Sequence, residues 1–124
     1  MPSPRLILVV EDDDDARETL RMLLESKGYQ VEVAENGRGA IEKALARVPH
    51  VALVDVGLPD VDGHVVARAI RQQPEGAQVF LVALTGYSAA ADRRLATSAG
   101  FDAYLVKPVE LSAIERLLDR PPSS

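Results

Sequence analysis

Two apolar segments of this chain end abruptly in acidic residues. Residues 6–10 are leucine, isoleucine and valine and run into the five acids of residues 11–15, and residues 51–54 run into Asp55. Short apolar runs with β-branched residues, bounded by polar sequence, are typical of strands buried on both faces of a parallel sheet. Sites in open α/β sheets form where the carboxyl ends of such strands emerge. Carboxylates gathered there repel one another unless they are protonated or bind a metal ion, so the pattern predicts a fold and an acidic site together.

The composition narrows the class of protein. The chain has 124 residues, enough for one domain with its own core, and 47% of them are hydrophobic. A net charge of -5 argues against a nucleic-acid groove, and the lack of cysteine removes disulfides and thiolate sites. No apolar stretch approaches the ~20 residues of a membrane span, and the first five residues lack signal-peptide character. We expect a cytoplasmic domain that binds neither nucleic acid nor a membrane directly.

Strand-like and helix-like segments alternate along the chain. Strands are predicted at residues 6–10, 30–34, 51–55, 79–84 and 103–106, and helices at residues 16–27, 38–47, 64–72, 89–98 and 110–120. This alternation predicts a doubly wound, five-stranded parallel sheet of the flavodoxin-like (βα)5 type, with right-handed crossovers. Residues 1–120 would form the domain, and the Pro/Ser residues 121–124 a tail or linker stub.

Helical spacing also predicts which residues the first two helices bury. The expected stripes are Ala16, Leu20, Leu23 and Leu24 in the first helix and Ala40, Ile41, Ala44 and Leu45 in the second. Asp14 or Asp15 would cap the first helix, and negative charge near a helix N-terminus is favourable. We therefore expect residues 13–15 to serve the helix and not a metal ion.

Polar side chains follow four of the five predicted strands. They are Glu11 and Asp12 after the first strand, Asp55 at the end of the third, Thr85 after the fourth and Lys107 after the fifth. Because the carboxyl ends of parallel strands meet on one side of the sheet, these groups can converge. The carboxylates can hold Mg²⁺, which prefers oxygen ligands, and Asp55 can act as a nucleophile. Lys107 and Thr85 can bind phosphoryl oxygens, so the set is complete for phosphoryl transfer to Asp55.

These residues carry a family resemblance. The matching segments are residues 9–12 (VVED), Asp55 with Leu58-Pro59 and Asp62-Gly63, residues 83–86 (ALTG), and residues 104–108 (YLVKP). Over nearly its whole length the chain resembles the receiver domain of two-component response regulators. The Pro/Ser ends are also compatible with a receiver from a hybrid sensor histidine kinase.

The resemblance implies roles for the site residues. Asp55 would be the phosphoacceptor, receiving the phosphoryl group from a phosphohistidine of a sensor histidine kinase or histidine phosphotransfer protein. Asp12 would ligate Mg²⁺ directly, Glu11 mostly through water, and Gly57 through its backbone carbonyl. Glu11 stands where the family often has Asp, and its extra methylene still reaches a metal-bound water.

The resemblance also implies a conformational switch. Thr85 and Lys107 would contact the phosphoryl oxygens, and Tyr104 would swing inward as Thr85 is drawn to the phosphate. The output surface for a downstream protein, or for a homodimer, would comprise the last strand and the last two helices. The Lys107–Pro108 bond would be cis. The domain would be a self-phosphorylating switch and not a turnover enzyme.

Alternative interpretations depend on single residues. Taken alone, Thr85 could cap a turn, Lys107 could be a surface lysine and Tyr104 could be ordinary packing. Asp60 and Asp62 would serve the loop turn, and His50 and His64 would be surface or loop residues.

Three other functions share parts of this pattern. A flavodoxin-like nucleotide binder would need a phosphate-cradling loop after the first strand, where this chain has acids. A magnesium-dependent phosphatase of the haloacid-dehalogenase type would need an acid two residues after the nucleophile, where this chain has Gly57. A pseudo-receiver that only binds proteins stays open, although all the required side chains are present.

Overall fold

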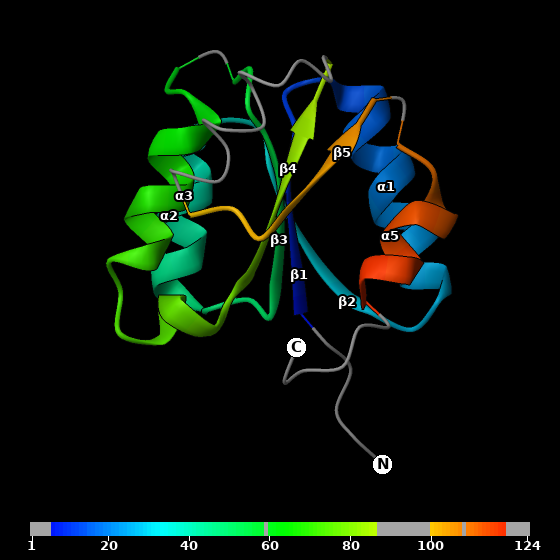
Figure 1. The fold of residues 1–124 in the computed structure, drawn as a ribbon. Coiled ribbons are helices and arrows are strands. Elements are labelled where there is room, and N and C mark those ends of the chain that lie inside the picture. The colour runs from blue at the N-terminus through cyan, green and yellow to red at the C-terminus, as the bar shows by residue number, and fades with distance from the viewer. Residues whose placement is uncertain (1–5, 59, 87–99, 108, 119–124) are drawn as a thin grey trace.

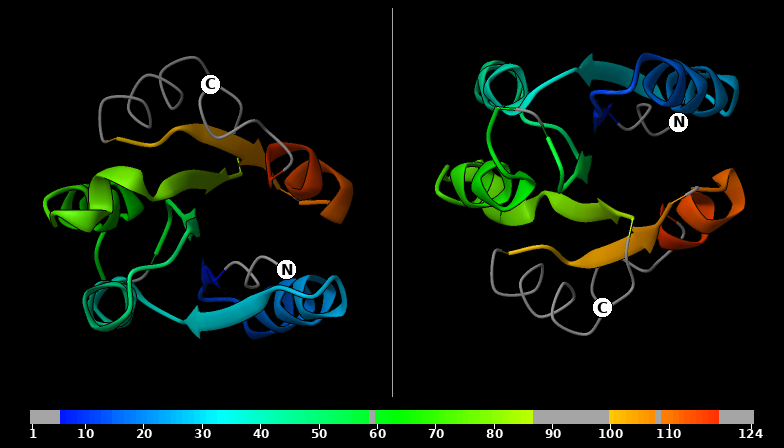
Figure 2. Two further views of the ribbon diagram at one scale, coloured as in Figure 1. Left: turned by 90° about the horizontal axis from the view of Figure 1, so that it is seen from below. Right: turned by 90° about the horizontal axis from the view of Figure 1, so that it is seen from above.

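The computed structural model describes residues 6–58, 60–86, 100–107 and 109–118. Its elements, in chain order, are β1 (Leu6–Val10), α1 (Asp14–Ser26), β2 (Gln30–Ala34), α2 (Gly37–Ala46), β3 (Val51–Asp55), α3 (Gly63–Arg71), the short 3₁₀ helix η1 (Glu75–Gln78), β4 (Phe80–Thr85), β5 (Ala103–Val106) and α5 (Leu111–Leu118). The strands form one parallel sheet in the order β2-β1-β3-β4-β5 (Figures 1 and 2). The predicted doubly wound α/β fold is confirmed. The helix predicted at residues 89–98 lies outside the described residues.

Helices cover both faces of the sheet. α2 and α3 lie on one face, and α1 and α5 on the other (Figure 1). Along β1, Leu8 and Val10 face the α2–α3 side, whereas Ile7 and Val9 face the α1–α5 side. Every residue of β1 and β3 is buried, which explains why these strands are uniformly apolar.

α1 differs from its prediction at both its cap and its buried face. Asp13 caps the helix, because its Oδ1 accepts hydrogen bonds from the backbone N–H groups of Asp15 and Ala16. The helix therefore begins at Asp14, and the expectation that Asp14 or Asp15 is the cap is wrong. Leu23 is 36% exposed, because α1 directs only Leu20 and Leu24 fully into the core.

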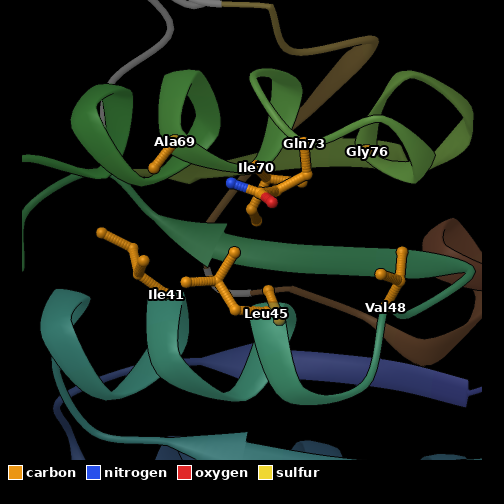
Figure 3. A pocket seen from close by; sticks show the side chains of 8 residues that line it. Ile41, Leu45, Val48, Ala69, Ile70, Gln73 and Gly76 are labelled. Atoms are coloured by element: carbon orange, nitrogen blue, oxygen red, sulfur yellow. The ribbon is translucent and has the colours of Figure 1, made fainter.

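α2 lies close to the sheet and buries small side chains. Ala40 and Ala44 are buried as predicted, but Leu45 is 51% exposed and lies at the edge of the gap between α2 and α3 (Figure 3). Gly37 begins the helix against the loop before α3, where a Cβ atom would lie 2.1 Å from Val61 Cγ2. A residue larger than glycine would require the Val61 side chain or the start of α2 to shift.

Arg71 ties the end of α3 to the segment that precedes β5. Its guanidinium donates hydrogen bonds to the carbonyl oxygens of Gly76, Val79 and Gly100 and to the carboxylate of Asp102. The same Asp102 oxygen accepts the backbone N–H of Leu81 in β4. This network fixes where β5 starts.

Within the part of the chain that the structure describes, no helix has the length and apolar character needed to cross a membrane.

Candidate functional site

Three carboxylates meet at the carboxyl ends of β1 and β3. Ligand oxygens of Glu11, Asp12 and Asp55 all lie within 4.8 Å of one another. β1 and β3 are neighbours in the sheet, with Val10 paired to Val54, so the residues at their ends are brought together. Glu11 is 1% exposed and Asp55 7% exposed, whereas Asp12 is exposed. The cluster therefore has two buried carboxylates and one that faces solvent.

Lys107 provides the positive charge of this cluster. Its Nζ lies 2.7 Å from Glu11 Oε1 and 3.0 Å from Asp55 Oδ2, so one ammonium pairs with both buried carboxylates. The backbone N–H of Lys107 donates to the carbonyl oxygen of Thr85, at 2.8 Å. This bond extends the β4–β5 pairing by one residue and positions the lysine at the end of the sheet.

The loop after β3 holds Asp55 from two directions. The backbone N–H of Gly57 donates to Asp55 Oδ1, at 2.9 Å. Gly63, where α3 starts, lies directly against the Asp55 backbone, and a Cβ atom there would be 2.5 Å from the Asp55 carbonyl oxygen. Asp55 is thus fixed at both its side chain and its main chain.

The surroundings shift the pKa values of the two buried acids in opposite directions. Burial raises the pKa of Glu11; its hydrogen bond with Lys107 opposes this shift, and that with Asp55 adds to it. Burial alone would raise the pKa of Asp55, but hydrogen bonds from Gly57, Glu11 and Lys107 outweigh burial and lower it. Of the two acids, Asp55 is therefore the one whose pKa the surroundings lower, and Glu11 the one whose pKa they raise.

The donor set of the cluster fits a hard divalent cation. Three carboxylates supply oxygen ligands, and an exposed member leaves the site open to metal-bound water. The backbone N–H of Asp13 donates to Glu11 Oε2, at 3.3 Å, so Asp13 supports Glu11 and is not a member of the cluster. Gly57 lies beside the cluster through its N–H contact with Asp55.

Thr85 and Tyr104 lie on the two strands that follow. Thr85 ends β4, is 6% exposed, and pairs with Val106 across the sheet. Tyr104 pairs with Ala83 and packs, partly buried, against the core on the α2–α3 side. The structure thus places Thr85 and Lys107 together, with Tyr104 three residues before the lysine.

Comparison with known proteins identifies the family. A family model described as the response regulator receiver domain matches residues 7–119. The chain belongs to the response regulator receiver domain family.

Relatives of this receiver domain share both sequence and fold. An uncharacterised 14.6 kDa protein in the sodA1 3′ region of Leptolyngbya boryana is 38% identical over 114 residues, covering 92% of this chain and 87% of the relative. The response regulator MprA of Mycolicibacterium vanbaalenii is 38% identical over 117 residues, covering 94% of this chain but 48% of the relative. The chain thus spans about half the length of that response regulator.

Solved receiver structures superimpose closely. The chemotaxis protein CheY4 of Vibrio cholerae matches with a TM-score of 0.90 at 27% identity, covering 94% of this chain and 98% of the other. The receiver domain of the sensor histidine kinase PA1611 from Pseudomonas aeruginosa matches at 0.88 and 33% identity, covering 98% and 99%, and its structure has a magnesium ion coordinated in the active-site cleft. The predicted family and fold are confirmed.

Two polar contacts of this receiver domain could not be inferred from the strand-end pattern. Arg17 donates from Nη1 to the carbonyl oxygen of Glu11, at 3.0 Å, and so holds the chain where it leaves β1. Asp60 accepts hydrogen bonds from the N–H groups of Gly37 and Arg38, which joins the loop after β3 to the start of α2. The only available signal for Arg17 was a cation three residues after Asp14, with which it pairs.

The remaining loop acids and histidines serve local structure. Asp62 caps α3 by accepting the N–H of His64, at 2.8 Å. His50 is exposed, and its Nδ1 accepts the N–H of Leu6. His64 differs from its prediction as a surface or loop residue: it lies in α3, its side chain is 18% exposed, and its ring meets Phe101 edge-on at 6.0 Å. Pro59 and Pro108 lie outside the described residues, and with Pro108 the expected cis bond to Lys107.

Proposed function

We propose that this chain is the phosphoacceptor of a two-component phosphorelay and that Asp55 receives the phosphoryl group from a phosphohistidine. One observation carries the proposal: the buried Asp55 ends β3 with a backbone N–H on one carboxylate oxygen and the Lys107 ammonium on the other. The donor would be a sensor histidine kinase or a histidine phosphotransfer protein, which is the role the family implies.

The transfer uses this chain's own groups. An Asp55 carboxylate oxygen attacks phosphorus, the P–N bond to the donor histidine breaks, and an acyl phosphate forms on Asp55. Lys107 is placed to pair with phosphoryl oxygens, because it already holds the carboxylate that they would join. Thr85, which shares a backbone hydrogen bond with Lys107, supplies a nearby hydroxyl. Gly57 orients the carboxylate before transfer.

The carboxylates of Glu11, Asp12 and Asp55 and the carbonyl of Gly57 would hold Mg²⁺. The bound ion would neutralise negative charge on the phosphoryl oxygens and on the clustered acids. The donor set of this chain and the magnesium ion in the PA1611 receiver support this assignment. Without the ion, burial raises the pKa of Asp55, but hydrogen bonds from the Gly57 N–H, Glu11 and Lys107 lower it further than burial raises it.

The phosphoryl group would act as a switch. It adds negative charge beside Thr85, and movement of Thr85 would let Tyr104 change its packing on the face of β5. The affected surface includes β5 and α5, where Val106 is 41% exposed, and would receive a downstream protein or a second copy. Such a domain is modified once per signal and turns over no substrate.

Incubation with acetyl phosphate, with Mg²⁺ or with EDTA, tests the chemistry. Intact mass should show one labile phosphoryl adduct only when Mg²⁺ is present. Asp55→Asn should abolish the adduct, while Asp60→Asn, an exposed acid of the same loop, should retain it. An adduct that survives Asp55→Asn would overturn the assignment of Asp55. No adduct on the folded wild type, with either acetyl phosphate or a phosphohistidine donor, would favour the pseudo-receiver.

A further inference from the structure

The three carboxylates of the cluster differ in how they are held. Lys107 and a backbone N–H group bind each of the two buried carboxylates, Glu11 and Asp55. Asp12, in contrast, is exposed, and no hydrogen bond or salt bridge joins its carboxylate to another described residue. The direction of the Asp12 side chain is therefore set by the main chain on either side of it.

Arg17 binds the main chain both before and after Asp12. Its Nη1 donates to the carbonyl oxygen of Glu11, at 3.0 Å, and its own backbone N–H donates to the carbonyl oxygen of Asp13, at 2.9 Å. The N–H of Glu11 in turn donates to the carbonyl oxygen of Ala34 in β2, at 3.0 Å. The two neighbours of Asp12 in the chain are thus both bound by one residue of α1.

Burial keeps the Arg17 side chain in this position. Only 12% of the side chain is exposed. Its Nη2 also pairs with Asp14, but the Asp14 side chain is 81% exposed, and an ion pair so open to solvent contributes little. The bond to the Glu11 carbonyl has a charged donor and is partly buried, and hydrogen bonds of this kind are stronger than neutral ones. It is therefore the contact of the Arg17 side chain whose loss should matter most.

We propose that Arg17 is a positioning residue for the metal site: by holding the Glu11 carbonyl, it directs the Asp12 carboxylate toward the cluster. The inference rests on the proposed function, in which Glu11, Asp12 and Asp55 hold Mg²⁺. Arg17 acts through the main chain and touches neither the ion nor the phosphoryl group.

The charge of Arg17 would act in the opposite direction. A cation beside the cluster repels Mg²⁺, so if charge alone mattered, removal of the guanidinium would strengthen Mg²⁺ binding. Positioning of Asp12 requires that the same change weaken it. The sign of the change in affinity therefore separates the two effects.

Calorimetric titration of Mg²⁺ into Arg17→Met measures this sign. Methionine is a good helix former and keeps the backbone N–H bond to Asp13, so the variant loses the bond to the Glu11 carbonyl and the ion pair with Asp14. We expect the affinity for Mg²⁺ to fall by roughly tenfold, as for other groups that orient metal ligands. Arg17→Lys should recover part of the loss, because an ammonium can still donate to the carbonyl.

Arg21→Met is the matched control in the same helix. Arg21 lies one turn further along α1, and its described contacts are with Glu18 and Glu25. Its substitution removes the same charge and should leave Mg²⁺ affinity unchanged or slightly raised. Melting temperatures in EDTA confirm that each variant is folded.

A measurement without metal separates failure of this inference from failure of the metal site itself. In EDTA, the ¹⁵N order parameters of the Asp12 and Asp13 amides should fall in Arg17→Met and not in Arg21→Met. Unchanged or tighter Mg²⁺ binding by Arg17→Met, or unchanged order parameters, would overturn the role of Arg17 and leave the assignment of Mg²⁺ to the cluster standing. A folded wild type that binds no Mg²⁺ would overturn that assignment, and this inference with it.

Discussion

The Lys107 ammonium and the Glu11 carboxylate form a 2.7 Å ion pair across the carboxyl ends of β5 and β1. The Glu11 side chain is almost fully buried, whereas a third of the Lys107 side chain is exposed. β3 and β4 separate these strands in the sheet, so the lysine must extend over both. The pair therefore links the clustered carboxylates at the ends of β1 and β3 to the end of β5.

Loss of Lys107 should destabilise the metal-free protein. Lys107→Met leaves Glu11 and Asp55 as neighbouring buried acids without a cation, and we expect the free energy of unfolding to fall by about 1–3 kcal/mol. Urea denaturation in EDTA measures this change. In a double-mutant cycle, Glu11→Gln should recover part of the loss, because one of the two unpaired acids is then neutral.

Independent, additive effects of Lys107→Met and Glu11→Gln would contradict this account of the pair. Lys43→Met is a suitable control, because Lys43 is an exposed lysine of α2 remote from the carboxylates. Its loss should change stability much less.

Stability of the metal-free protein should depend on pH through Glu11. Burial is the main cause that raises the folded-state pKa of Glu11 above its ordinary value of 4.5, so the folded protein retains the proton longer than the unfolded chain. The stability from this group is fully present below that ordinary value and is lost as pH rises through the folded-state pKa. The free energy of unfolding of wild type minus that of Glu11→Gln should therefore fall as pH rises from 4.5 toward neutrality.

Asp55 contributes with the opposite sign and at lower pH. Its folded-state pKa is lowered, so its contribution is present above its ordinary value of 3.8 and is lost as pH falls through the folded-state pKa. Denaturation curves of wild type, Glu11→Gln and the exposed control Glu42→Gln are measured in EDTA at a series of pH values. The series covers the range above pH 4.5, where Glu11 acts, and the range below pH 3.8, where Asp55 acts. If the free energy of unfolding of wild type minus that of Glu11→Gln instead rises with pH, the folded-state pKa of Glu11 is not raised.

Most of the fold was predictable because strand burial leaves a strong sequence signal. The uniformly apolar β1 and β3 are buried on both faces, and their ends place Glu11 and Asp55 together without any information beyond strand order. Parallel pairing converts positions far apart in the chain into neighbours, which is why residues at four strand ends could be considered one site.

Contacts that depend on tertiary geometry were not predictable. Asp60 reaches the start of α2 from the loop after β3, and Arg71 binds carbonyl oxygens of the η1 turn and of Gly100. The sequence pattern around Asp60 and Arg71 does not distinguish either residue from an ordinary surface residue. The exposed Leu45 was missed for a related reason: helical periodicity predicts an apolar stripe but not how much of its width the sheet covers.

Asp12 and Asp14 should differ sharply in their effect on Mg²⁺ binding. Asp12 belongs to the carboxylate cluster, whereas Asp14 lies in the first turn of α1 and pairs with Arg17. We expect Asp12→Ala to weaken Mg²⁺ binding by roughly tenfold or more and to remove the Mg²⁺ dependence of phosphorylation, while Asp14→Ala leaves both nearly intact. Isothermal titration calorimetry with Mg²⁺ and adduct formation with acetyl phosphate are the two measurements. Similar losses in both variants would mean that the whole acidic run acts on the metal through its charge alone.

Gly63 should tolerate no side chain, because the backbone of Asp55 and Val56 occupies the space that a Cβ atom would need. A Cβ atom would lie 2.5 Å from the Asp55 carbonyl oxygen and 2.6 Å from Val56 Cα, and backbone atoms cannot move aside as a flexible side chain can. We expect Gly63→Ala to lower the free energy of unfolding by about 1–3 kcal/mol and to slow adduct formation on Asp55. Gly86→Ala is the matched control for stability, since nothing lies within 4 Å of its added Cβ, and it should be neutral or slightly stabilising. Thermal and urea denaturation compare the two, and equal stability would show that the loop after β3 can shift without disturbing Asp55.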